Sequence, residues 1–200
     1  MRSRKILFFS AVASLFLAVS ARAQTMQAPK PGPEVKKMAV FVGHFTEDGE
    51  AKAGVMGPNS PAMKMSGSED CKWTAGGFAI ICTGSAQIGE MKSSETALLY
   101  YDPGDKMYHY HDVDSAGDTG DSTGTVDGDT WTWTGKGSMG GQVLYTKYTM
   151  KGVSKNGYEW TMAAGDSESN EQEGMTGKVT RSTAATAAKP AAAAAKPAAQ

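Results

Sequence analysis

Two histidines at the alternating spacing of a β-strand are the residues of this chain best suited to chemistry. His109 and His111 lie in the segment from Met107 to Val113, where every second side chain of a strand points to the same face. Two imidazoles placed in this way can bind one metal ion. No third ligand is identifiable, because His44 would serve only if its strand lay nearby. The alternative is a pair satisfied by neighbouring side chains or solvent, and we therefore expect neither a metal nor another cofactor.

The loop that follows the histidines is acidic but lacks the pattern of a calcium site. Asp112 and Asp114 open it like an EF-hand, yet its fifth position is Ala116 and its twelfth is Thr123 instead of glutamate. The sequence also has no nucleophile elbow, phosphate-binding loop or zinc-protease helix. We predict no catalytic residue and do not expect an enzyme, although paired carboxylates on neighbouring strands remain an open alternative.

The two cysteines stand at positions that a tight hairpin would bring together. A two-residue turn at Gly76-Gly77 would pair Trp73 with Ile80 and place Cys71 directly opposite Cys82. Such cross-strand Cβ atoms come close enough for a disulfide. Because the sequence contains no C-x-x-C motif, we predict a structural bridge rather than a redox site.

Turn residues interrupt the chain about every ten positions, which is typical of an all-β sandwich or barrel. The intervening segments alternate in polarity, and the short connections favour an antiparallel meander over a parallel sheet. We predict ten strands: 44–49, 63–74, 78–86, 95–101, 106–114, 122–127, 130–136, 142–151, 158–164 and 174–181.

Large aromatic side chains recur on one face of several of these strands. In Thr130 to Thr134, for example, both tryptophans point one way and the three threonines point the other. In a closed barrel one face of every strand is the interior, so these rings would fill it or line a cavity. The predicted lining residues are Phe45, Trp73, Phe78, Leu99, Tyr101, Trp131, Trp133, Tyr145 and Trp160.

The first 23 residues have the composition of a signal peptide. Positive residues precede an apolar stretch from Ile6 to Val19, and Ala21-Arg22-Ala23 matches a small-x-small cleavage site. We expect cleavage after Ala23, a secreted or periplasmic protein, and no transmembrane anchor in the mature chain.

Cleavage would remove four positive charges and no negative ones, so the net charge would change from −1 to −5. That balance disfavours nucleic acid as a partner. Residues 24–34 are proline-rich and are predicted to form a linker, and residues 183–200 form an Ala/Lys/Pro-rich segment predicted to be a disordered tail.

The segment before the first strand has helical spacing, with Val35, Met38, Ala39 and Val42 on one face, and Gly43 ends it. This helix, the Gly43-x-Phe45 entry, and the order of the later hairpins resemble the family catalogued as domain of unknown function 1579. The hairpins in question are Trp73-Thr-Ala-Gly-Gly-Phe78 and Leu98-Leu-Tyr-Tyr-Asp-Pro-Gly-Asp-Lys-Met-Tyr108. The chain departs from the family in having Phe45 where the entry usually carries tryptophan, and in its cysteine pair.

The resemblance implies a bacterial protein with a closed, lipocalin-like (calycin-type) up-and-down antiparallel barrel over residues 35–182, and it carries over no catalytic residue. Small barrels with aromatic linings often enclose a ligand. We therefore expect an exported protein that binds a small apolar or amphipathic molecule in the barrel interior. The alternatives are an envelope structural or interaction protein with a filled core and, less favoured, a metal-binding protein or an enzyme.

Overall fold

The computed structural model describes residues 29–182, which form one short helical segment followed by ten strands. The predicted signal peptide, residues 24–28 of the predicted linker, and the predicted tail lie outside the described residues. The helical segment consists of α1 (Pro33–Lys37) and a 3₁₀ turn, η1 (Met38–Phe41). It begins two residues before the predicted domain boundary, because Pro33 occupies the first helical turn, where proline is favoured.

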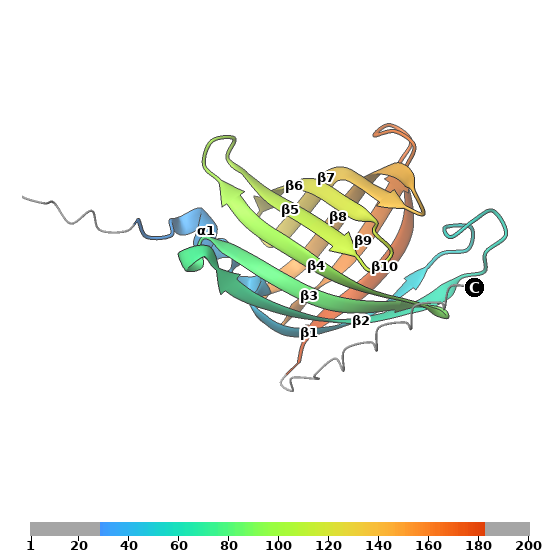
Figure 1. Cartoon of the computed structure of the whole chain (residues 1–200), viewed down its shortest axis with the longest axis horizontal. Coiled ribbons are helices and arrows are strands. Elements are labelled where there is room, and N and C mark those ends of the chain that lie inside the picture. The colour runs from blue at the N-terminus through green and yellow to red at the C-terminus, as the bar shows by residue number, and fades with distance from the viewer. Residues whose placement is uncertain (1–28, 183–200) are drawn as a thin grey trace, which may run out of the picture. The chain divides into compact units, whose positions relative to one another are not determined.

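The ten strands form a closed antiparallel barrel in which every strand pairs with its sequence neighbours and β1 pairs with β10 (Figure 1). The all-β, up-and-down prediction is therefore confirmed. The strands are β1 (Gly43–Ala51), β2 (Met63–Thr74), β3 (Ala79–Ile88), β4 (Met91–Asp102), β5 (Met107–Asp114), β6 (Thr119–Asp127), β7 (Thr130–Met139), β8 (Gln142–Ser154), β9 (Gly157–Gly165) and β10 (Gln172–Arg181).

The hairpin between β2 and β3 has the predicted register and a longer turn than predicted. Trp73 pairs with Ile80, and Cys71 pairs with Cys82, to which it is joined by a disulfide. The turn is a short 3₁₀ segment over Ala75–Gly77 that starts after Thr74, so Ala75 is not part of the ladder. The predicted disulfide is confirmed.

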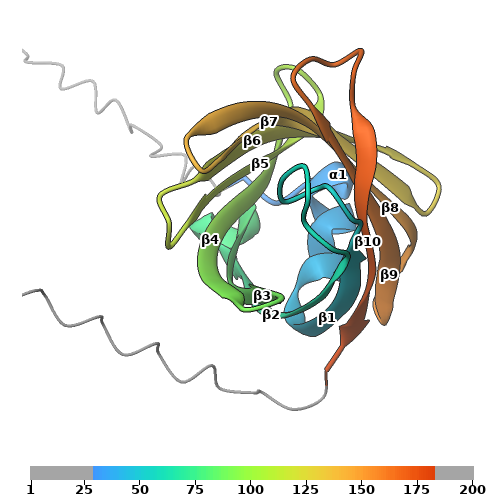
Figure 2. The ribbon, with the colours of Figure 1, turned by 90° about the vertical axis from the view of Figure 1, so that its right-hand side faces the viewer.

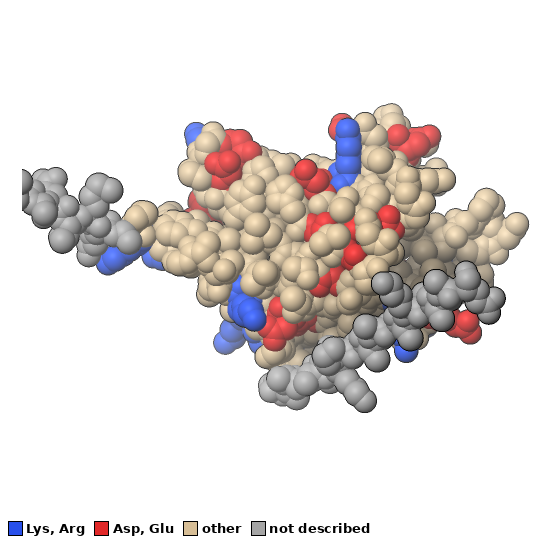
Figure 3. All heavy atoms as spheres, viewed as in Figure 1, with Lys and Arg blue, Asp and Glu red and all other residues tan. Residues whose placement is uncertain are grey.

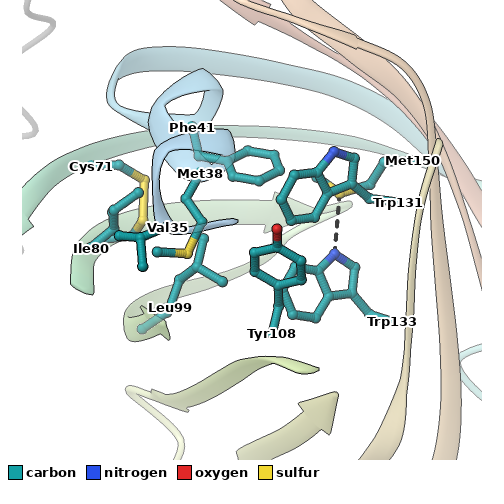
Figure 4. Packing of buried hydrophobic residues seen from close by; sticks show 12 residues of the cluster. Val35, Met38, Phe41, Cys71, Ile80, Leu99, Tyr108, Trp131, Trp133 and Met150 are labelled. Carbon is teal, nitrogen blue, oxygen red and sulfur yellow. Dashed lines mark hydrogen bonds between the residues drawn. A yellow bond between two sulfur atoms is a disulfide. The ribbon is translucent and has the colours of Figure 1, made fainter. Parts of the chain in front are cut away.

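The helical segment closes one end of the barrel with an apolar cluster (Figure 4). Met38 is fully buried, and the Phe41 ring meets the edge of Trp131 at 4.8 Å between centroids. The Tyr108 hydroxyl donates one hydrogen, shared between the carbonyl and carboxylate oxygens of Glu34 at 3.1 and 2.9 Å. The helix is thus fixed to the strands by both packing and hydrogen bonds.

A second apolar cluster lies along β1, β9 and β10, around Phe45, Trp160, Met175 and Val179. The connection between β1 and β2 lies at the end of the barrel opposite α1, as Figures 1 and 2 show. Val55 of this connection packs against the second cluster. The two ends of the barrel are therefore built differently, one closed by a helix and the other bordered by a loop.

Arg181, at the end of the last strand, secures the junction between β10 and the start of β1. Its guanidinium donates to the carbonyl oxygens of Val42 and Val40, at 2.8 and 3.3 Å, and lies 4.5 Å from the centre of the Phe45 ring. These contacts satisfy carbonyl groups that the helical turn leaves without partners.

More acidic than basic side chains are visible on the face of the barrel in Figure 3. The described residues include no helix of sufficient length and apolarity to cross a membrane.

Candidate functional site

Three glutamates point into the middle of the barrel. Glu47 alternates with Phe45 on β1, Glu69 with Cys71 on β2, and Glu95 with Ala97 on β4, so each shares the inward face of its strand.

Two glycines on neighbouring strands make room for these side chains. Glu47 pairs with Gly67, and a Cβ at Gly67 would lie 3.1 Å from Oε2 of Glu47. Glu95 pairs with Gly84, where a Cβ would lie 3.3 Å from Oε1 of Glu95. The carboxylates of Glu47 and Glu95 therefore each lie over the glycine on the neighbouring strand.

The environment of the glutamates disfavours their charged forms. Burial, followed by the negative charge of Glu95, raises the pKa of Glu47 to about 7 and that of Glu69 to about 8. Burial, followed by the charges of Asp112 and Asp114, also raises the pKa of Glu95. Among the described residues no lysine or arginine acts to lower the pKa of any of the three.

Three tyrosines surround the carboxylates. Tyr110, Tyr148 and Tyr158 keep part of their surface accessible, yet burial is the largest cause of the raised pKa of each hydroxyl. The charge of Glu69 raises the pKa of all three further, which places the hydroxyls close to the glutamates. The interior is therefore aromatic and acidic together.

Two tryptophans complete the interior. Trp160 stacks on Tyr148 with ring centroids 5.2 Å apart, and its indole lies near enough to Glu47 to lower the pKa of that carboxyl. Nevertheless Nε1 of Trp160 makes no hydrogen bond of regular geometry within the described chain. By contrast, Nε1 of Trp133 donates to the sulfur of Met150 at 3.3 Å.

The predicted lining residues fall into three groups. Leu99, Trp131 and Trp133 are buried in the cluster beneath the helix, where Phe78 and Tyr101 pack against them. Phe45 and Trp160 are buried in the second cluster. Trp73 is 36 % exposed, and Tyr145 lies on the outer face, where the ammonium of Lys136 stands 4.7 Å from its ring centre.

The two histidines lie on the outer face of β5 with stacked rings, 6.1 Å apart between centroids. Nε2 of His109 lies 2.9 Å from Asp105, and Nδ1 of His111 lies 3.3 Å from Asp121. His109 forms a group with Asp102 and Asp105 whose ligand atoms lie within 4.8 Å of one another, and His111 is not part of it.

The remaining histidine, His44, pairs with Asp70 at 2.6 Å on the strands β1 and β2. Each histidine of the described chain therefore has a carboxylate partner of its own.

A hollow of about 590 Å³ lies over β1, β2 and β10 and includes Lys64 and Lys178. Most of its lining residues have outward register, such as Asp48, Lys64 and Lys178, so it lies on the outer face of the barrel and is open to solvent. It contains none of the predicted lining residues and none of the three glutamates. We therefore locate the candidate site in the barrel interior.

Sequence reasoning missed Glu47, Glu69 and Glu95 because it searched the inward faces for aromatic residues. The signal was present, since each glutamate is two or four residues from a predicted lining residue of the same strand, namely Phe45, Trp73 or Leu99. Glu47 and Glu69 stand on the neighbouring strands β1 and β2, diagonally across the ladder.

Among solved structures the chain is similar to Rv2717c from M. tuberculosis, at 14 % identity and a TM-score of 0.54, over 76 % of this chain and 99 % of that one. It is also similar to EF1p2_mFAP2b, described as bound to DFHBI, at 12 % identity and a TM-score of 0.38, over 74 % of this chain and 98 % of that one. The first likeness supports the fold. No match was found among curated proteins.

The family model described as protein of unknown function (DUF1579) matches residues 30–181, which is nearly the whole described chain. The chain belongs to this family.

Proposed function

We propose that the protein binds a small amphipathic molecule inside its barrel. The observation that carries this proposal is that Tyr110, Tyr148 and Tyr158, all on the inward faces of their strands, keep part of their surface accessible. Inward side chains of a completely filled barrel would be fully buried, so this partial exposure supports a recess in the interior. Ligand sites are typically recesses of this kind, apolar with a few polar groups.

The apolar part of the ligand would lie toward the end opposite the helix. Met65, Ile88 and Met162 pack there around the second cluster and are only partly buried. Methionine side chains adapt to irregular shapes, which suits contact with a flexible apolar group. The polar part of the ligand would then meet the tyrosines and glutamates deeper in the barrel.

The closed end would prevent passage through the barrel. Val35, Met38 and Phe41 fill it, so entry would occur beside the connection between β1 and β2. We further propose that the protein acts outside the cytoplasm, which the Cys71–Cys82 disulfide supports because such bonds persist in oxidising compartments.

Binding of a neutral fluorescent probe, N-phenyl-1-naphthylamine, tests the proposal. We expect fluorescence enhancement with the native protein and its loss in Ala86→Trp, which places a large ring on the inward face of β3. The matched control is Thr96→Trp, on the exposed outer face of β4, which should bind the probe normally. Absence of binding to the native protein, or equal binding by both variants, would favour the structural alternative with a filled core.

A further inference from the structure

We propose that the ligand carries an organic ammonium group, held among the carboxylates of Glu47, Glu69 and Glu95. The inference rests on the proposed binding of a ligand inside the barrel and specifies its chemistry. The clusters at the two ends of the barrel consist of apolar and aromatic side chains, which do not select a charged ligand. The glutamates in the middle of the interior therefore determine which ligand charge fits.

The three carboxylates are spread over the wall instead of meeting at a point. Glu69 and Glu95 stand on opposite sides of Gly84, on strands two apart, which separates their backbones by about 10 Å. Glu47 lies diagonally from Glu69, because it pairs with Gly67, two residues along the same strand.

This spacing fits a bulky cation better than a metal ion. The described groups of potential ligand atoms within 4.8 Å of one another do not include the three glutamates as a set. Glu69 is grouped only with Cys71 and Cys82, whose sulfurs are joined in the disulfide. A small metal ion needs ligand atoms about 2–2.6 Å from it, which carboxylates so dispersed cannot supply together.

Among the described residues no cationic group acts on these carboxylates. The charged groups that do act on them are acidic: Asp48, next to Glu47 on the outer face of β1, and Asp112 and Asp114 near Glu95. The three tyrosines near them are neutral. A buried carboxyl that lacks a cation keeps its proton, and it ionises at lower pH when a cation lies beside it. A cationic ligand would supply the missing partner.

A second observation also indicates a ligand in this place. Trp160 is only 4 % exposed and its indole lies against Glu47, yet its Nε1 makes no hydrogen bond of regular geometry within the described chain. Buried donors are rarely left without an acceptor, so this N–H is available to an acceptor atom of the ligand.

The rings around the carboxylates favour the same chemistry. The stacked pair of Tyr148 and Trp160 borders Glu47, and Tyr110 packs near Trp133 at 6.0 Å between centroids. The faces of such rings attract ammonium groups, as in the aromatic cages that bind quaternary ammonium ligands.

Three probes with the same tail separate charge from apolar contact: decyltrimethylammonium, decanol and decanoate, each below its micelle concentration and measured by calorimetry. We expect decyltrimethylammonium to bind at least about tenfold more tightly than decanol, and decanoate to bind least. At pH 8.5, where both carboxyls are ionised, the affinity for the cation should fall about tenfold in Glu69→Gln and Glu47→Gln, while the affinity for decanol stays within about twofold. The matched control, Glu159→Gln, changes an exposed glutamate on the outer face of β9 and should alter neither affinity.

The outcomes distinguish this inference from the proposed function. Equal binding of the cation and decanol, or unchanged cation binding in both inward variants, would overturn the ammonium assignment and leave binding in the barrel intact. Binding of none of the three probes, together with no binding of the naphthylamine probe, would overturn both. Circular dichroism establishes that each variant is folded. Independently of any variant, the affinity of the native protein for the permanently charged probe should rise between pH 6 and pH 8.5, and the affinity for decanol should not.

Discussion

The carboxylate of Glu47 lies directly over Gly67 on the neighbouring strand, so close that a single added carbon at position 67 would stand 3.1 Å from Oε2. The backbone oxygen of Ser85 lies at 3.0 Å from the same point, on the opposite neighbour of Gly67. The position of an acidic side chain inside the barrel therefore depends on the absence of a side chain beside it.

Replacing this glycine should destabilise the protein. In Gly67→Ala the new methyl group must displace Glu47 or the β3 backbone, and we expect the free energy of unfolding to fall by about 1–3 kcal/mol. Urea denaturation measures it. Gly137→Ala on β7 is the control, because its added carbon meets nothing nearer than 3.5 Å and should cause no loss. Equal effects of the two substitutions would argue against the close approach.

The raised pKa values predict that stability falls as the pH rises. The native state retains protons on Glu47 and Glu69 up to pH about 7 and about 8, whereas the unfolded chain releases them near 4.5. The native state therefore binds more protons within this window, and the free energy of unfolding decreases with pH across it. We expect a decrease of several kcal/mol between pH 5 and pH 8.5.

Denaturation of variants at several pH values attributes this effect to the interior. Glu69→Gln cannot ionise, so it should flatten the decrease and be more stable than the native protein at pH 8.5. Glu159→Gln, on the outer face, should retain the full decrease. If the free energy of unfolding instead rose from pH 5 to pH 8.5, the glutamates would be ionised in the native state without destabilising it.

The helix at the closed end should contribute strongly to stability. Met38 is fully buried within the cluster it shares with Ile80 and Leu99, so Met38→Ala should lower the free energy of unfolding by about 2–5 kcal/mol. Met91→Ala provides the comparison, because Met91 is 49 % exposed and its truncation should cost less than about 0.5 kcal/mol. Thermal or urea unfolding measures both effects. A small effect of Met38→Ala would show that the helix is only loosely attached to the barrel.

The disulfide closes a short loop, since Cys71 and Cys82 are 11 residues apart. Cross-linking a loop of this size is expected to stabilise by about 2–3 kcal/mol, through the restricted unfolded state. The double variant Cys71→Ala/Cys82→Ala should therefore unfold at a lower urea concentration than the native protein but keep its barrel. A reducing agent should lower the urea midpoint of the native protein and leave that of the double variant unchanged. A thiol assay that detects two reactive thiols in the native protein would contradict the bridge.

The backbone of this protein was largely predictable from sequence, because strand and turn chemistry act locally. Alternating polarity located all ten strands, and the hairpin arithmetic placed Cys71 opposite Cys82. The turn after Thr74 was misjudged, since two glycines suggested the tightest turn and the chain instead forms a 3₁₀ segment.

Side-chain placement around the barrel was harder to predict. Tyr145 was assigned to the interior because of its size, yet the strand alternation set by Tyr148 and Met150 turns it outward. The inward glutamates were overlooked for the opposite reason, since carboxylates are normally expected on the solvent face. Which aromatic rings fill the barrel also depends on where the helix docks, and the strand pattern alone does not specify that.

The pairing of β1 with β10 has a consequence for how the chain is made. On its side facing β10, Phe45 pairs with Arg181, near the end of the domain, so the barrel cannot close during synthesis until almost the whole domain has emerged. Until then both outer strands present free edges, which are the sites at which chains join one another. Substitutions in β10 should therefore reduce the yield of folded protein more than equally buried substitutions in the central hairpins.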